Sequence, residues 1–156
     1  MIFFTKEFVI ALVTSYFASC GFAVVFHTNK RHLPLVGVAG LLSYFVYYTV
    51  EFYSESLFLA AFISSFAVTF FGEIIARTSH APALIFIVAG LIPTVPGAGS
   101  YYSMKYLIQG ESALAAESLL KTGTIAIGIA SGLVVVSIVF GMIVDLKNSQ
   151  KRRHKT

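Results

Sequence analysis

Charged residues are scarce in this sequence, and their scarcity excludes most soluble folds. Asp, Glu, Lys and Arg make up 12% of the 156 residues, about half the share of an ordinary soluble domain. Apolar residues make up 57%, and the mean hydropathy is +0.84. No stretch is left for a soluble domain of useful size. The composition therefore predicts an all-α, polytopic helical bundle in the lipid bilayer, because helices satisfy their own backbone groups there.

The sequence also lacks the residue patterns that are typical of disulfides, catalytic nucleophiles and metal sites. One cysteine cannot form an intrachain disulfide, so Cys20 says nothing about redox compartment. No nucleophile motif is present, and the histidines fall at expected helix ends or in the tail without metal-ligand spacing. The sequence thus predicts no enzyme, no metal site and no cofactor. The histidines are His27, His32, His80 and His154.

Five apolar segments are long enough to cross a membrane, since about 20 helical residues span its core. The expected transmembrane domain is 1–146, with spans at about 7–27, 33–52, 57–76, 82–109 and 119–144. Residues 147–156 form a basic tail, which is typical of a membrane anchor and not of a nucleic-acid site. In this arrangement Lys30, Arg31, Arg77 and the tail share one side of the membrane. That side is then cytoplasmic, which predicts a multi-pass protein of the cell membrane with its amino end outside and its carboxyl end inside.

Two stripes of small residues predict helix packing faces. In the last span, Thr124, Gly128 and Gly132 recur at helical spacing and favour close approach of another helix. Just before this span, Glu117 and Lys121 are spaced to form an ion pair across one helical turn. The first span carries the other stripe, which consists of Ala11, Thr14, Ser15, Ala18 and Gly21.

The third span places Ser65, Thr69 and Glu73 on one helix face, because they recur every four residues. An acidic residue within a span is a functional candidate by default, and Glu73 is such a residue. The alternative is that Glu73 pairs with Arg77 one turn later and anchors the helix end near the membrane surface. The sequence leaves both interpretations open.

The fourth segment is interrupted by two prolines and two glycines between positions 93 and 99. Proline lacks an N–H and clashes with the preceding turn, so a helix that begins near Pro82 must break about 16 Å inward, near the bilayer midplane. Ser100 is expected to cap a second half-helix that ends at Gly110. Residues 97–110 either complete the span or lie on the outer membrane surface, and both placements remain open.

A break at this depth offers backbone carbonyls, free N–H groups and hydroxyls to a small-molecule carboxylate, with Lys105 as a compensating cation. The alternative is a turn that serves packing alone. The expected site consists of Pro93, Thr94, Pro96, Gly97, Gly99, Ser100, Tyr101, Tyr102 and Lys105.

Three stretches carry a resemblance to a known family: the run from Gly21 to Phe26 with the basic turn after it, the run from Ile92 to Gly97, and the final small-residue span. Together they resemble the small membrane subunit of the ThrE-like threonine/serine exporters, the carboxyl-terminal half of the exporter. The most specific element is Ile-Pro-x-x-Pro-Gly.

The resemblance implies proton-linked export of threonine and serine, or of dicarboxylates in some two-chain systems. Glu73 is then the candidate for proton coupling. The resemblance also implies a larger membrane subunit with a soluble cytoplasmic domain as the partner. A second copy of this chain is a further candidate partner. A non-transporting structural or assembly subunit, whose break only builds an interface, is the alternative function.

Overall fold

The computed structural model describes residues 6–153, and within them the side chains of residues 6–143. This part of the chain forms helices and contains no strand, which confirms the all-α prediction. The α-helices are α1 (Lys6–Val25), α2 (Leu33–Ser54), α3 (Leu57–Ser79), α4 (Ala83–Leu91), α5 (Gly97–Ile108) and α6 (Ser112–Arg153). Two short 3₁₀ turns, η1 (Lys30–His32) and η2 (Ile92–Thr94), precede α2 and follow α4.

Four of these helices are long and apolar enough to cross a membrane: α1, α2 joined to η1, α3, and α6 up to Ile143. The pair formed by Ala83–Thr94 and Gly97–Ile108 passes the same test together but is bent by 50°. The structure therefore has four candidate spans, or five if the bent pair counts as one, as expected for a polytopic bundle with one broken helix.

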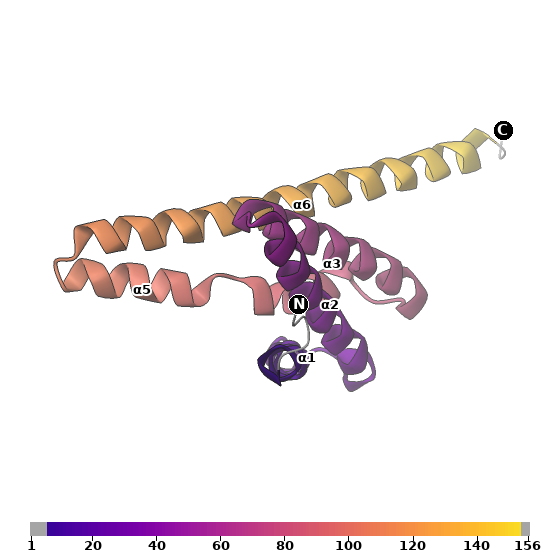
Figure 1. Cartoon of the computed structure of the whole chain (residues 1–156). Helices are drawn as coiled ribbons and strands as arrows, with labels where there is room; N and C mark the ends of the chain where they lie inside the picture. The colour runs from indigo at the N-terminus through magenta and orange to yellow at the C-terminus, as the bar shows by residue number, and fades with distance from the viewer. Residues whose placement is uncertain (1–5, 154–156) are drawn as a thin grey trace.

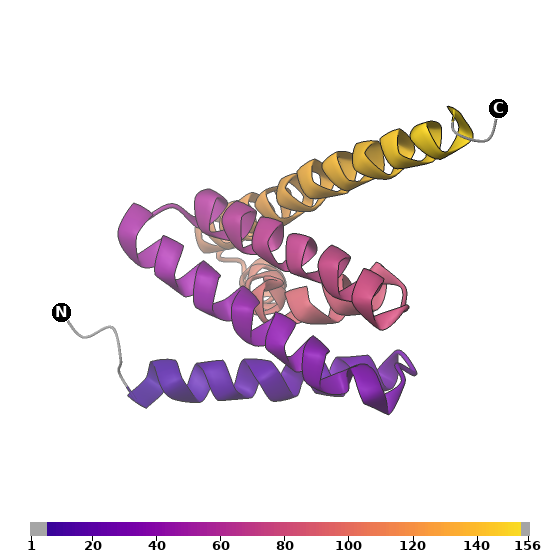
Figure 2. The same cartoon turned by 90° about the vertical axis from the view of Figure 1, so that its right-hand side faces the viewer.

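The bundle combines contacts between successive helices with contacts between helices that are distant in the sequence. Helix α1 packs on α2, α2 on α3 and α4, and α3 on α4 and α6. Figure 2 shows α1, α2 and α3 as successive crossing layers, with α6 on the side of α3 away from α1. An apolar cluster of Ala39, Val68, Ile87 and Leu91 is buried inside the bundle. Small side chains such as that of Ala39 let these helices approach closely.

The predicted seam on α6 is confirmed, and its partner is α3. A Cβ atom added at Gly128 would lie 2.8 Å from the carbonyl oxygen of Phe58, and one at Gly132 would lie 3.0 Å from the backbone nitrogen of Phe66. Neither position has room for a side chain, so both glycines permit this contact.

The packing face predicted for the first span is largely wrong. Thr14, Ala18 and Gly21 are exposed, and the buried stripe of α1 is Phe8, Ser15, Ser19 and Ala23. The reason lies in the partner, because α2 presents Gly40 at the position where Ser15 and Ser19 approach it. Small residues on one helix cannot fix which face packs until the partner's small residue is known.

Helices α5 and α6 form an antiparallel hairpin that projects from the bundle. In Figure 1, α5 and the first part of α6 extend to the left of α1, α2 and α3. Among the described residues, α6 is the only helix with which α5 makes extensive contacts. The turn between them contains Gly110, whose φ is 78°, a conformation that favours glycine. With 42 residues, α6 is about 63 Å long, roughly twice the thickness of the hydrocarbon core.

Candidate functional site

The helix break lies where the sequence predicts it, but it is shorter. Helix α4 ends at Leu91, η2 makes one turn with Pro93 in it, and α5 begins at Gly97 directly after Pro96. A proline disrupts the turn before it and permits helix after it, which is why α5 starts earlier than the expected 100. Thr94 is the eleventh residue after Ala83, about 16 Å along a helix axis and close to half the thickness of a bilayer core.

The carbonyl groups at the end of α4 are hydrogen-bonded within the chain. The Thr94 hydroxyl donates to the carbonyl of Leu91 at 2.9 Å, and the Val95 N–H lies 3.2 Å and 3.3 Å from the carbonyls of Leu91 and Ile92. The expectation of unsatisfied carbonyls is therefore wrong for Leu91 and Ile92. The Val95 N–H thus takes the place of the donor that Pro96 lacks for the Ile92 carbonyl, and the Thr94 hydroxyl is a second donor to Leu91.

Three hydroxyl groups from distant segments meet at the break. The Thr94 Oγ1 atom lies 3.0 Å from Ser43 Oγ of α2, which lies 3.3 Å from Ser64 Oγ of α3. Ser64 donates to the backbone carbonyl of Ser43 at 2.8 Å. All three side chains are buried, with Ser43 and Ser64 at 0% and Thr94 at 7% exposure. We call this group the hydroxyl cluster.

The hydroxyl cluster offers neutral hydrogen-bond donors and acceptors inside an apolar bundle. Ser64 and Thr94 each direct their hydrogen to a backbone carbonyl, so the Ser43 hydroxyl donates to one of the other two hydroxyl oxygens. Buried polar groups are costly unless they are paired, and here they are paired with one another. A ligand that reaches the cluster must exchange one of these bonds for its own.

The remaining residues of the expected site do not converge on Thr94. Pro93 and Pro96 are half-buried and shape the chain. Gly97, Ser100, Tyr101, Tyr102 and Lys105 are exposed on α5, and Gly99 is half-buried. The structure thus divides the expected set between the bundle interior and the projecting hairpin.

Ser100 does not cap α5, so that prediction is wrong. The N-cap residue is Pro96, and Ser100 is the fourth residue of the helix, where its hydroxyl donates to the carbonyl of Pro96 at 3.2 Å. The glycines of the break do not have positive φ, which among the described glycines occurs only at Gly110. Gly99 allows close packing, because a Cβ atom there would clash with Thr122 of α6.

Glu73 forms the ion pair with Arg77 that the anchoring interpretation requires. Its Oε2 atom lies 3.7 Å from the Arg77 guanidinium, which also lies 4.8 Å from the centre of the Phe140 ring of α6. On the same face, Ser65 and Thr69 are fully buried, and the Ser65 hydroxyl donates to the carbonyl of Ile129 at 2.7 Å. The stripe therefore joins α3 to α6 and carries a paired carboxylate at its end.

Sequence reasoning missed Ser43, the hydroxyl partner of Thr94, and Ser64, which is hydrogen-bonded to Ser43. Ser64 is adjacent to Ser65, which the four-residue spacing singled out, and Ser43 lies in the middle of an apolar span. A hydroxyl residue at the middle of each of two spans is a signal, because polar groups at that depth need partners. Within the described part of the chain, no three His, Cys, Asp or Glu residues gather as they would around a metal ion.

Comparison with known proteins gives one match. The model of the family described as "Threonine/Serine exporter, ThrE" matches residues 11–139, which include α2 to α5 and most of α1 and the apolar part of α6. No curated protein and no solved structure matches the chain.

Proposed function

The chain belongs to the threonine/serine exporter family ThrE, and we propose that it is the membrane subunit of a two-component exporter whose substrate site includes the helix break at Ile92–Pro96. As members of this family are exporters, the chain is a multi-pass membrane transport protein. The proposed substrates are small amino acids, threonine and serine, or dicarboxylates. The proposed location is the cell membrane, with the carboxyl end in the cytoplasm.

The observation that carries the proposal is the break itself. Thr94 brings a hydroxyl to about half the depth of a span and meets Ser43 and Ser64 there. Irregular backbone at membrane depth persists where it is buried in protein or lines a cavity, and broken helices of this kind form substrate sites in secondary transporters. The first turn of α5 adds the N–H groups of Ala98 and Gly99, which suit a carboxylate.

Glu73 is the proposed proton-coupling residue. It is an ionisable group on α3, and Ser65 and Thr69 on its face reach into the bundle. Intramembrane carboxylates commonly serve proton relays. Its pairing with Arg77 also fits simple anchoring, so the two roles need a direct test.

A larger membrane subunit with a soluble cytoplasmic domain is the proposed partner. The projecting hairpin supports this proposal, because Tyr101, Met104 and Ile108 are 66%, 60% and 82% exposed and lie outside the bundle. Lipid or a second protein must cover such side chains. Self-association of the chain is a further way to cover them.

The second candidate function is a structural or assembly subunit that does not itself bind substrate. The hydrogen bonds of the hydroxyl cluster favour it, because all three hydroxyls already have partners. In that case the break serves only to connect the bundle to the projecting hairpin.

The test is efflux of threonine, serine and succinate from cells that express this chain with and without the larger subunit. Efflux of one substrate class should require both chains. The double variant Pro93→Ala/Pro96→Ala should abolish it while membrane insertion and partner binding persist, because a continuous helix has no free N–H groups at mid-depth. Pro34→Ala is the matched control, since Pro34 lies in the first turn of α2. Unaltered efflux in the double variant would favour the structural subunit.

A further inference from the structure

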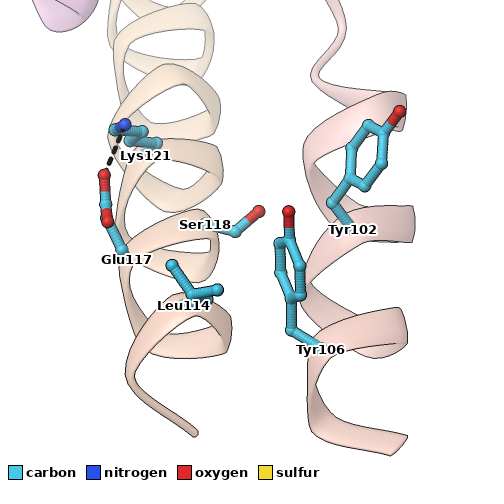
Figure 3. A pocket seen from close by; sticks show the side chains of 6 residues that line it. All are labelled: Tyr102, Tyr106, Leu114, Glu117, Ser118 and Lys121. Carbon is cyan, nitrogen blue, oxygen red and sulfur yellow. Dashed lines mark hydrogen bonds and ion pairs between the residues drawn. The ribbon is translucent and has the colours of Figure 1, made fainter. Parts of the chain in front are cut away.

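A groove lies between α5 and the first turns of α6, outside the site described above. It encloses about 240 Å³ and is lined by Tyr102, Tyr106, Leu114, Glu117, Ser118 and Lys121. Figure 3 shows the hydroxyl groups of Tyr106 and Ser118 pointing toward one another between the two helices, with Glu117 and Lys121 on the α6 side. The volume equals that of about eight water molecules, so a molecule of the size of threonine fits.

The charged part of the lining is one cation and one anion in direct contact. Lys121 Nζ lies 2.7 Å from Glu117 Oε1, and the two side chains are 60% and 61% exposed. An exposed pair of this kind contributes little to stability, so a ligand can separate it at small cost. The pair then offers an ammonium to a carboxylate and a carboxylate to an ammonium.

The rest of the lining suits a short polar side chain. The phenol group of Tyr106 and the hydroxyl of Ser118 (Figure 3) can each donate or accept a hydrogen bond, while Leu114 and the ring of Tyr102 supply apolar contacts. A small hydroxy amino acid carries all the matching groups. A dicarboxylate matches less well, because its second carboxylate would face Glu117. Lys105, whose Nζ lies 5.9 Å from the centre of the Tyr102 ring, is a further cation beside the lining.

The groove is continuous with the helix break. Ser118 lines the groove and also donates a hydrogen bond to the Gly99 carbonyl at 3.0 Å. Gly99 in turn lies in the first turn of α5, three residues after Pro96. The groove therefore lies next to the first turn of α5, one hydrogen bond away from the end of the break.

We propose that the groove between α5 and α6 is a second binding site of the exporter, selective for zwitterionic hydroxy amino acids over dicarboxylates. Glu117 binds the substrate ammonium group and Lys121 binds its carboxylate. The proposal rests on the proposed function for the identity of the substrate, but the site itself is distinct from the helix break.

The test uses fluorescence, because the chain contains no tryptophan. Leu114→Trp places a single tryptophan in the groove of the full chain in lipid nanodiscs, and its fluorescence is excited selectively over that of the tyrosines. Titration with L-threonine should give a saturable change. Two analogues, 2-hydroxybutyrate without the ammonium group and 1-amino-2-propanol without the carboxylate, should bind about tenfold more weakly, as should succinate.

Charge variants of the Leu114→Trp chain test the roles of Glu117 and Lys121. Glu117→Gln and Lys121→Gln should each weaken L-threonine binding by about tenfold. Glu111→Gln, an exposed carboxylate in the turn before α6, is the matched control and should leave binding unchanged. Tyr102→Trp is the second reporter if Leu114→Trp fails to fold by circular dichroism, because the Tyr102 hydroxyl points away from α6 (Figure 3).

Three results would overturn the proposal: no response to L-threonine with either reporter, equal responses to succinate and L-threonine, or binding that survives both charge variants. Thr94→Val separates this proposal from the proposed function. It removes one hydroxyl group at the break and replaces neither a proline of the bend nor a groove residue, so the L-threonine titration should persist even where efflux is reduced. Lost titration with intact efflux would reject the groove alone.

Discussion

Thr94 shows how a single hydroxyl connects the helix break to the rest of the bundle. It donates to the Leu91 carbonyl of its own segment and lies 3.0 Å from Ser43 of α2. Ser43 extends the connection to Ser64 of α3. The position of the break therefore depends on polar contacts with two other helices as well as on its prolines.

Thr94→Val keeps the shape of this side chain and removes its hydroxyl. We expect a loss of about 1 kcal/mol in stability, the usual contribution of one hydrogen bond, and reduced efflux. Thr94→Ser is the control, because it restores the hydroxyl and should recover both. Thermal unfolding in detergent and efflux from cells measure the two effects. If Thr94→Val transports as well as the native chain, the cluster has no role in transport.

Glu73 and Arg77 form a natural pair of test positions, because removing either side chain breaks the same ion pair. The pair is partly exposed, so each variant should lose only up to about 1 kcal/mol of stability. Glu73→Gln should abolish proton-dependent efflux, since it removes the titratable carboxyl group. Arg77→Gln should retain that efflux. Equal behaviour of the two variants, with efflux followed at several imposed pH gradients, would instead assign Glu73 to anchoring.

At the scale of the elements, α5 is placed by its prolines and by one glycine. Pro93 and Pro96 interrupt the helix, and Gly99 then allows the new helix to lie directly against α6. The two roles are physically different. The first concerns backbone hydrogen bonds, and the second concerns the space that a methyl group would fill.

Two glycines of α5 separate packing from backbone flexibility. A Cβ atom at Gly99 would clash with the Thr122 hydroxyl group, whereas one at Gly97 would have no neighbour within 4 Å. Gly99→Ala should therefore destabilise the hairpin by about 1–3 kcal/mol, as overpacking does. Gly97→Ala should be neutral or slightly stabilising, because alanine favours the helix. Protease sensitivity of residues 97–125 measures hairpin stability, and equal sensitivity of both variants would contradict this assignment.

Local chemistry made the break predictable, and tertiary contacts made its surroundings unpredictable. Proline disrupts the helical turn that precedes it in its own segment, so the interruption at Pro93 and Pro96 can be predicted from the sequence. The ion pair of Glu117 with Lys121 was predictable for the same reason and is confirmed. Ser43 and Ser64 belong to other helices, and only the packing of α2 on α3 brings them to Thr94. The role of Ser100 was misjudged because helix can resume immediately after Pro96.

At the scale of the whole molecule, the distribution of basic residues sets the expected orientation. Lys30 and Arg31 lie in η1, and Arg77 lies in the last turn of α3. The basic residues of 147–155 follow at the end of α6, where side chains lie outside the described part of the structure. The positive-inside rule assigns this side to the cytoplasm.

Labelling with an impermeant thiol reagent tests this orientation in a Cys20→Ser background. Cysteines placed at Asn29 and Asn148 should be protected in intact cells, and a cysteine at Ser54 should react. All three should react once the membrane is permeabilised, which controls for buried thiols. Reaction at Asn29 in intact cells would rule out the proposed topology.

The contact of α6 with α3 lies near the middle of a very long helix. Helix α3 contacts α6 from Gly128 to Phe140, with about 24 Å of α6 before this contact and about 20 Å after it. A rigid rod held in its middle part acts as a lever with its fulcrum at this contact. Any tilt of α6 about this point therefore moves the hairpin groove and the basic end of the helix in opposite directions, which ties the conformations of the two ends together without any contact between them.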